Sequence, residues 1–424
     1  MTTHDSVGGA LAARYVQIRD FSLELCAPLS SEDCAIQTMP DVSPTRWHLA
    51  HTTWFFETII LAERPGHKPF DPNFDYLFNS YYNAIGDQYP RHERGLLSRP
   101  SLDEVLAYRR YVDECMAQVF ESEQALAEAA GRIEVGLNHE QQHQELILTD
   151  IKHVLAQNPL RPVYREGTFR KSVPPPIDRW MPYPEGTYWV GHAGEGFGFD
   201  NESPRHREFL EAFELNCNLV SCGDYIRFIE DGGYRRPALW LSLGWEAVRE
   251  QGLSAPLYWH RDGSDFTQYT LAGQRKVDPA LPVCHVSYFE ADAFARWAHA
   301  RLPTESEWEL ASESAPIEGG FVDSLLSDAR AIHPASDMET SVPIRQLFGD
   351  VWEWTASPYI AYPAFAPAEG VLGEYNGKFM CNQYVLRGGS CATSRDHMRR
   401  TYRNFFPPEA RWQFSGIRLA RDGG

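Results

Sequence analysis

The chain has 424 residues and a formal net charge of −19 at pH 7. This length is long for a single hydrophobic core and favours two domains, and the acidic balance argues against a nucleic-acid or anionic-membrane surface. The N-terminal sequence shows no signal-peptide pattern, and no apolar run is long enough to predict a membrane span. Eight cysteines are scattered without a C-x-x-C pair, which is typical of a reduced, cytoplasmic protein.

Residues 1–165 predict a helical domain. Apolar residues recur at spacings of three and four in several segments, enough for a bundle. Ser101 and Glu104 match a capping box, while Ser43 and Pro44 match an N-cap and the first residue of a helix. The four segments are "RYVQIRDFSLELCAPL", "SPTRWHLAHTTWFFETIILAE", "SLDEVLAYRRYVDECMAQVFESEQALAEA" and "NHEQQHQELILTDIKHVL".

Residues 166–184 are rich in proline and predict a linker. From 185 to 424 the pattern changes to short aromatic and β-branched runs broken by Gly, Asn, Asp and Pro, which predicts an α+β domain. The helical segments that stand out are "SCGDYIRFIEDGG", "SYFEADAFARWAHA" and "TESEWELASES". We expect Trp308, Trp352 and Trp354 to supply buried scaffold in this domain.

The segment "HEQQH" at 139–143 matches the zinc-protease pattern H-E-x-x-H. On a helix His139 and His143 share a face, so the pair is able to hold one metal ion. Glu140 lies about 100° from His139 around such a helix. That angle leaves two interpretations open, a peptidase base or a bystander, because the glutamate of the proteases is placed in the same way. A third ligand is the better discriminator.

His51 is the best candidate for that ligand. It shares a predicted helix face with Trp47 and Trp54 and should point into the bundle, whereas His48 is expected at the edge of that face. His153 would lie about 21 Å along the axis from the first histidine of the pair, too far to share an ion. Three neutral imidazoles suit iron with open coordination positions, and they also suit zinc. The plain alternative is that these are ordinary core histidines.

Three segments of the helical half are "WHLAHTTWFFE", "FNSYYNAIGDQYPRHERGLLSRP" and "NHEQQHQELILTDIKH". Together they resemble the DinB-like helical domain of the ergothioneine-type sulfoxide synthases. "FDNESPRH", "RLPTESEWELA", "GDVWEWTASPY" and "VLRGGSCATSRDHMRRTYRNFF" resemble the formylglycine-generating-enzyme or sulfatase-modifying domain, which is related to C-type lectins. The resemblance implies an N-terminal DinB-like four-helix bundle followed by a C-type-lectin-like domain of that type.

The resemblance also implies an activity and its site. Members of this family use non-heme iron(II) and dioxygen to join a thiol sulfur to the imidazole C2 of hercynine. It implies Fe(II) on His51, His139 and His143, with Gln142 contacting the imidazole or betaine region of hercynine. Asn404 corresponds to the hercynine-binding asparagine of the family.

Two departures from the family patterns matter for the substrate. The cysteine pair of the formylglycine-generating enzymes is replaced by Thr393 and Met398, and Cys391 stands at another offset, so that activity is not implied. Synthases that use γ-glutamylcysteine resemble this chain but carry an Asp and an Arg where it has Phe406 and Ala410. An apolar pair is unsuited to a charged glutamyl group, so free cysteine is the expected sulfur donor.

The "SYYN" segment resembles the cysteine-using branch, in which a tyrosine of the helical domain acts as acid or base. Tyr81 and Tyr82 are therefore the catalytic candidates, expected on extended backbone with their hydroxyls pointing opposite ways, and Tyr375 is a looser match to the tyrosine of the other branch. Arg91 and Arg94 are candidates for binding the carboxylate of the donor. Alternatively, both arginines serve solvent or a domain interface.

Other functions stay open from the sequence. Within the same class, a relative that transfers selenium to make selenoneine or an ovothiol-type relative that uses histidine fits the same motifs. A zinc hydrolase and a non-catalytic, lectin-like binding module are alternatives from other classes, although three histidines disfavour the latter. The expected partners are hercynine, cysteine and O₂, with no nucleic acid and no membrane, and the sequence does not predict an oligomeric state.

Overall fold

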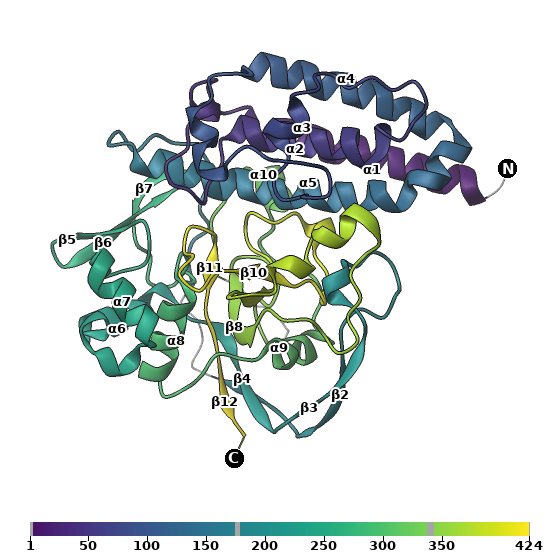
Figure 1. The fold of residues 1–424 in the computed structure, drawn as a ribbon. Helices are drawn as coiled ribbons and strands as arrows, with labels where there is room; N and C mark the ends of the chain where they lie inside the picture. The colour runs from purple at the N-terminus through teal and green to yellow at the C-terminus, as the bar shows by residue number, and fades with distance from the viewer. Residues whose placement is uncertain (1–2, 174–178, 337–342, 424) are drawn as a thin grey trace. The chain divides into compact units, whose positions relative to one another are not determined.

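The computed structural model describes residues 3–173, 179–336 and 343–423 (Figure 1). The chain forms two compact units: residues 1–160 with 369–375 make the first, and residues 161–368 with 376–424 make the second. Part of the predicted linker 166–184 lies outside the described residues, at 174–178, and its last residues form strand β1 (Trp180–Tyr183). A short C-terminal segment thus belongs to the helical unit, which no linear boundary anticipates.

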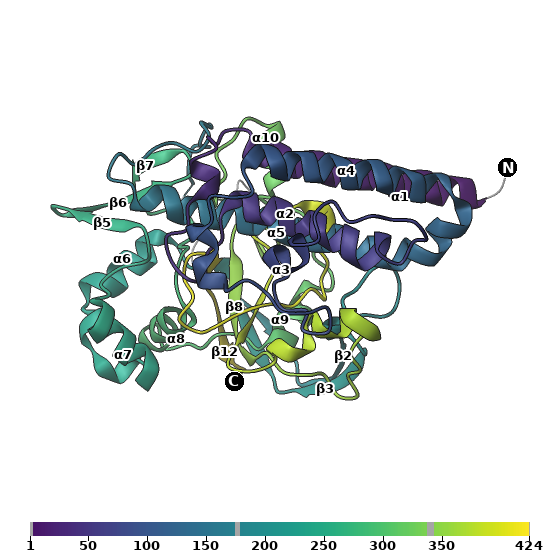
Figure 2. The same ribbon diagram turned by 45° about the horizontal axis from the view of Figure 1, so that its top comes forward.

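The first unit is built from the four predicted helices. Figure 2 shows α4 lying along α1, and both α4 and α5 pack on α2. Ser101 and Glu104 form the predicted capping box at the start of α4. The helices are α1 (Thr3–Cys26), α2 (Thr45–Phe56), α4 (Leu102–Glu121) and α5 (Glu123–Gln157), with a short α3 (Phe74–Phe78), a π-helical turn Glu57–Leu61, and 3₁₀ turns at Asp33–Ala35, Arg91–Leu96 and Gly370–Glu374.

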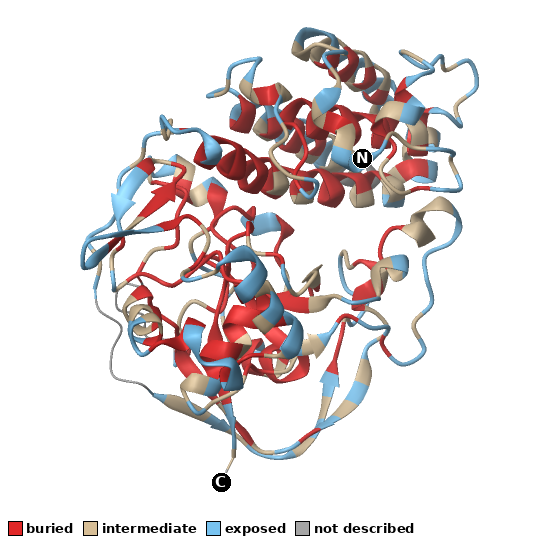
Figure 3. Cartoon of the chain, turned by 60° about the vertical axis from the view of Figure 1, so that its left-hand side comes forward, coloured by how far each residue is buried: buried red, intermediate tan, exposed pale blue. Residues whose placement is uncertain are grey.

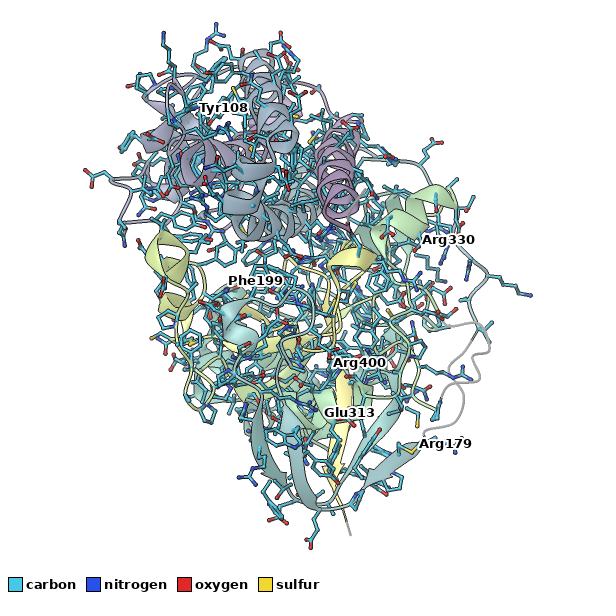
Figure 4. All side chains as sticks on the ribbon, turned by 90° about the vertical axis from the view of Figure 1, so that its right-hand side faces the viewer. Tyr108, Arg179, Phe199, Glu313, Arg330 and Arg400 are labelled. Atoms are coloured by element: carbon cyan, nitrogen blue, oxygen red, sulfur yellow. The ribbon has the colours of Figure 1, made fainter. Side chains whose placement is uncertain are left out.

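Helix α2 is the centre of this unit. All twelve of its residues are buried, and Figure 3 shows buried residues concentrated in the packed helices. Tyr108 of α4, labelled in Figure 4, is fully buried and donates its hydroxyl to Glu57 Oε2 at 2.7 Å, which joins α4 to the end of α2. A helix buried on all sides has no edge. The prediction that His48 lies at an edge is therefore wrong, since it is only 2% exposed.

The predicted start of α2 also needs correction. The helix begins at Thr45 with Pro44 at the N-cap position, so Ser43 is not the cap. The backbone N–H of Ser43 instead donates to Asp150 Oδ2 at 2.8 Å, and its hydroxyl accepts from Arg94 at 2.9 Å. The hydroxyl and the backbone N–H of Ser43 are thus engaged in tertiary contacts and are not used to cap the helix.

The second unit combines small sheets with short helices, as its sequence pattern predicts. Among the described residues, no helix of the protein combines the length and apolar character that a membrane crossing requires. One antiparallel sheet has the order β1–β4 (Phe213–Leu219)–β12 (Arg418–Asp422), and a second has the order β10 (Asn404–Phe406)–β9 (Tyr384–Arg387)–β8 (Trp352–Pro358)–β11 (Ser415–Gly416), in which β11 runs parallel to β8. The remaining strands are the hairpin β2 (Gly186–Val190)–β3 (His206–Leu210) and the meander β5 (Trp259–Asp262)–β6 (Asp265–Thr270)–β7 (Gly273–Lys276).

The helices of this unit include the three predicted ones, α6 (Cys222–Glu230), α8 (Tyr288–Trp297) and α9 (Glu305–Ser312), and two that were not predicted, α7 (Ser242–Gln251) and α10 (Val322–Ser327). Its core contains a fully buried ion pair between Arg418 and Glu353. Glu353 accepts from Arg418 Nε and from Trp308 Nε1, both at 2.8 Å. Trp308, Trp352 and Trp354 are fully buried, which confirms their expected place in the scaffold.

Candidate metal centre

Three histidines converge inside the helical unit. His51 comes from α2, whereas His139 and His143 come from successive turns of α5, and one ring nitrogen from each lies within 4.8 Å of the others. The Nε2 atoms of His51 and His139 are 3.2 Å apart. His51 donates Nδ1–H to the Phe78 carbonyl at 2.6 Å, so its Nε2 presents a lone pair to the cluster. This arrangement fits a metal ion ligated by three imidazoles.

The protonation state of the cluster also suits a metal. Burial lowers the pKa of His139 to about 3 and lowers the pKa values of His51 and His143 well below the ordinary value. All three rings are therefore neutral at pH 7, the form in which imidazole binds metals. His139 Nδ1 is buried and has no hydrogen-bond partner among the described residues.

A second pair of groups, missed from the sequence, lies directly behind this cluster. His48 Nδ1 is 2.8 Å from His143 Nδ1, and His48 Nε2 is 3.1 Å from Asp150 Oδ2. One signal was available for the carboxylate, because Asp150 follows His143 by seven residues and a spacing of seven returns to the same helix face.

A buried cation lies beside the cluster. Arg94 is 4% exposed, its Cζ lies 3.4 Å from the centroid of the Trp47 ring, and that ring stacks on His51 at 4.6 Å. The guanidinium donates to the hydroxyls of Ser43 at 2.9 Å and Ser80 at 3.2 Å. Within the described part of the chain it makes no ion pair with a carboxylate, and burial lowers its pKa well below the ordinary value. A cation in this state would be stabilised by an anionic ligand.

The other candidate arginine is placed differently. Arg91 is exposed, and its guanidinium donates to the backbone carbonyl of Asp41. Its own carbonyl accepts from Gln37 Nε2 at 2.8 Å. These contacts hold the turn at 91–96 in place without bringing the Arg91 side chain into the histidine cluster.

Tyr81 and Tyr82 lie side by side in a bend. Asn79 makes the bend, accepting from the Tyr82 N–H through Oδ1 and donating to the Tyr82 carbonyl through Nδ2, both at 3.0 Å. The two rings are 4.7 Å apart at an angle of 30°. The expectation of extended backbone with oppositely directed side chains is therefore wrong, because the asparagine side chain closes a local turn. Burial raises the pKa of both phenols, which stay protonated at neutral pH.

The C-terminal segment of this unit adds a third tyrosine. Tyr375 donates its hydroxyl to Gln142 Oε1, and its ring lies edge-on to His139 with centroids 5.6 Å apart. The preceding Glu374 carboxylate accepts from the backbone N–H groups of Asn83 and Ala84 at 3.0 and 2.8 Å. The segment thereby fixes the amide of Gln142 and the turn that follows the tyrosine pair. Local sequence gives no signal for a contact between residues so far apart.

Three further candidate residues belong to the second unit. Asn404 opens β10, and its Oδ1 accepts from the Phe405 N–H at 2.9 Å. Phe406 packs edge-on against Trp412 with ring centroids 5.6 Å apart, and Ala410 is 4% exposed. Ala410 thus places a buried methyl group at one of the two positions that the resemblance links to the choice of thiol.

Glu140, the glutamate of the H-E-x-x-H pattern, is held away from the cluster. It accepts from Arg19 Nη1 at 3.1 Å, from Arg109 Nη2 and from the Ser22 hydroxyl at 2.7 Å, and it is 1% exposed. Burial alone would raise its pKa, but the guanidinium groups of Arg109 and Arg19 outweigh this and lower it to about 2. A carboxylate this acidic is a poor general base at pH 7, which disfavours a peptidase.

Both halves of the chain match known families. Residues 14–147 match the DinB superfamily, and residues 173–337 and 327–423 match the sulfatase-modifying factor enzyme 1-like domain. These matches confirm the predicted fold, a DinB-like bundle followed by a domain of the formylglycine-generating-enzyme type.

Similar proteins extend over nearly the whole chain. The hercynine oxygenases of Mycolicibacterium thermoresistibile and Mycobacterium tuberculosis are 32% and 31% identical to it over 97% and 100% of this chain, and 94% and 100% of their own lengths are covered. Ergothioneine biosynthesis protein 1 of Schizosaccharomyces pombe is 25% identical over 53% of this chain and 28% of that protein.

The position of Glu140 predicts that its replacement destabilises the fold without a loss of bound metal. Replacing Glu140 by Gln leaves Arg109 buried without a carboxylate partner among the described residues, while Arg19 keeps its ion pair with Asp113. We expect the free energy of unfolding to fall by about 3–5 kcal/mol at pH 7. The stoichiometry of bound metal should not change, because Glu140 is not one of the converging ligands. Urea denaturation and metal analysis of the same samples measure both quantities.

This stabilisation should depend on pH in one direction. The pKa of Glu140 is lower in the folded protein than in the unfolded chain, so its ion pairs stabilise fully above the ordinary carboxyl pKa of about 4.3 and weaken as the pH falls toward 2. The difference in the free energy of unfolding between the wild type and Glu140→Gln should therefore become smaller as the pH falls across this range. Glu63→Gln, at the exposed pair with Arg132, is the control and should cost less than about 1 kcal/mol. A folded Glu140→Gln variant that has lost its metal would contradict this assignment.

Proposed function

Because the chain belongs to the hercynine oxygenase family, we propose that it joins the sulfur of cysteine to the imidazole C2 of hercynine, using dioxygen at an iron(II) site. The observation that carries the proposal is the convergence of His51, His139 and His143, three neutral and buried imidazoles from two helices. The family relationship supports hercynine as the acceptor, and the donor set supports a metal-dependent oxidation.

The proposed reaction balances in atoms and electrons. One C–H bond of hercynine and the S–H bond of cysteine break, while a C–S bond and an S–O bond form. One oxygen atom of O₂ ends in the sulfoxide, and the other leaves as water with the two hydrogens. Oxidation of the two substrates by four electrons matches the reduction of O₂ by four electrons.

The residues available for the ion are His51, His139 and His143. An iron(II) ion at this site would bind the donor thiol as a thiolate, lowering its pKa, and would supply the redox chemistry for O₂. Neutral ligands leave the positive charge of the ion uncompensated, which favours anionic thiolate. The protein's own contribution is to bury these rings, which keeps them neutral and away from bulk water, and to hold them in a fixed orientation.

We assign Arg94 to the carboxylate of the sulfur donor, with Arg91 as the weaker candidate. Arg94 is buried beside the histidine cluster and lacks a carboxylate partner among the described residues. Its guanidinium is therefore available to bind an anionic group of a substrate. Gln142, whose amide is fixed by Tyr375, and Asn404 are assigned to hercynine. The apolar Phe406 and Ala410 support free cysteine over γ-glutamylcysteine.

We assign proton donation to the Tyr81–Tyr82 pair. The raised pKa values keep both phenols protonated, which suits a donor and disfavours a tyrosinate base. Tyr375 is the alternative, because its ring contacts that of His139 and its hydroxyl already donates to Gln142.

The test of the proposed function is product formation in ligand variants. Alanine at His51, His139 or His143 should abolish both stoichiometric iron and sulfoxide formation from hercynine, cysteine and O₂, while far-UV circular dichroism stays that of a helical protein. His153→Ala is the matched control on α5, since the ring of His153 makes a hydrogen bond with Thr38 outside the cluster. This variant should keep both its iron and its sulfoxide-forming activity. A His51→Ala variant with full iron and full activity would refute the assignment.

The thiol preference is tested by competition kinetics. We expect a higher kcat/KM for cysteine than for γ-glutamylcysteine. The double variant Phe406→Asp, Ala410→Arg introduces the charged pair of the other branch and should shift the ratio of the two kcat/KM values toward γ-glutamylcysteine by about tenfold or more, because a hydrogen bond to a charged group contributes about 1.5–3 kcal/mol. A wild-type preference for γ-glutamylcysteine would show that another cation binds the glutamyl group.

The proton donor is tested by single phenylalanine variants. Tyr81→Phe or Tyr82→Phe should slow sulfoxide formation by about 10²–10⁴-fold or divert the reaction to oxidation of the thiol alone. Iron content and substrate binding should stay at wild-type levels, because the proposed ligands are the three histidines and protonated phenols are poor metal ligands. If both variants form sulfoxide at the wild-type rate, the assignment fails and Tyr375→Phe is the next variant to measure.

A further inference from the structure

A continuous chain of hydrogen-bonding groups links a buried carboxylate to one of the three histidines. Asp150 Oδ2 is 3.1 Å from His48 Nε2, and His48 Nδ1 is 2.8 Å from His143 Nδ1. Asp150, His48 and His143 are 3%, 2% and 8% exposed, so bulk water does not compete for these contacts. Nothing in the proposed reaction uses the carboxylate or the middle imidazole directly.

The geometry selects one arrangement of protons. If His143 presents Nε2 to an ion, its Nδ1 carries the proton and donates to His48 Nδ1. His48 must then accept through Nδ1 and carry its own proton on Nε2, which faces Asp150 Oδ2. Each donor meets an acceptor, and both imidazoles stay neutral. The same arrangement would not form if the middle residue were unable to accept and donate at once.

The chain also fixes α2 relative to α5. Asp150 lies on α5 and accepts the backbone N–H of Ser43, just before α2, at 2.8 Å. His48 lies on α2 and contacts His143 on α5. The two helices that supply the three converging histidines are therefore tied at two adjacent points.

The three histidines differ in their outer partners. His51 donates to a backbone carbonyl, and His139 Nδ1 has no partner among the described residues. Among the contacts of the described residues, an imidazole followed by a carboxylate lies behind His143 alone of the three. Partners of this kind raise the basicity of a metal-binding imidazole and hold its ring in one orientation.

We propose that His48 and Asp150 are positioning residues that fix the tautomer and ring orientation of His143 and thereby strengthen metal binding. The proposal rests on the metal site of the proposed function and extends it to residues that touch neither ion nor substrate. It makes His143 the most strongly supported ligand of the three.

The test uses Co(II) binding to metal-free full-length protein without substrates, so that the readout is independent of turnover. The dissociation constant and the visible d–d absorption are measured for each variant. His48→Phe should weaken Co(II) binding by about 10–100-fold and alter the absorption. His48→Gln should recover most of the affinity, because its amide oxygen accepts at His143 and its NH₂ donates to Asp150.

His67→Phe is the matched control. It removes another histidine of the same unit whose side chain is only 8% exposed and contacts a carboxylate, with His67 Nε2 3.3 Å from Glu57 Oε1. His67 is not part of the histidine cluster. The substitution should lower stability while leaving Co(II) affinity at the wild-type value. A general loosening of the helices would instead weaken binding in both variants and would overturn the proposal.

The remaining outcomes separate the two hypotheses. If the wild-type protein binds no Co(II) through His51, His139 and His143, the proposed function itself fails. If the wild type binds Co(II) and a folded His48→Phe binds it equally well, only the positioning role is refuted. Should His48→Phe fail to fold, Asp150→Asn decides: weaker binding supports the chain, and unchanged affinity and absorption overturn it.

Discussion

The carboxylate of Glu140, held between Arg19 and Arg109, is the constraint on which the rest of the helical unit depends. The two arginines come from α1 and α4, so one buried anion ties α5 to both neighbouring helices. Successive residues on a helix are about 100° apart. Fixing Glu140 toward the arginines therefore fixes the direction of His139, and His143 one turn later follows it toward α2.

Because of this constraint, the charged Glu140 and the neutral histidines beside it in the sequence point in different directions. The ion pairs satisfy Glu140, the one charged residue of the H-E-x-x-H segment, and the two histidines that remain are neutral. Burial keeps His51, His139 and His143 unprotonated, while Arg94 stays cationic against the Trp47 ring. A buried cluster of three lone-pair donors, with a nearby guanidinium that has no carboxylate partner among the described residues, suits a metal with an anionic substrate better than it suits hydrolysis by a glutamate base.

Much of this arrangement follows from local sequence. Periodicity predicts the four helices, the spacing of His139 and His143 places them on one face, and the aromatic face of α2 directs His51 inward. Local sequence fails to predict the environment of a residue whose contacts are with residues distant in the sequence. His48 is buried because α2 is surrounded on all sides, and Ser43 does not cap α2 because Asp150 and Arg94 use its polar groups.

The candidate tyrosines show the same limit of prediction from sequence. A side-chain turn at Asn79 brings Tyr81 and Tyr82 together, although alternation along an extended strand would separate them. Tyr375 reaches Gln142 from more than two hundred residues away, a contact that no periodicity encodes. The resemblance predicts roles for these residues, and the structure shows the partners that they contact.

The most direct test of the central claim is a crystal structure of the iron-loaded protein, with the metal located by its anomalous scattering. We predict one peak that is bound by the Nε2 atoms of His51, His139 and His143, with Glu140 still paired with its two arginines and Asp150 still in contact with His48. A peak elsewhere, or one with a Glu140 or Asp150 oxygen as a ligand, would contradict this claim.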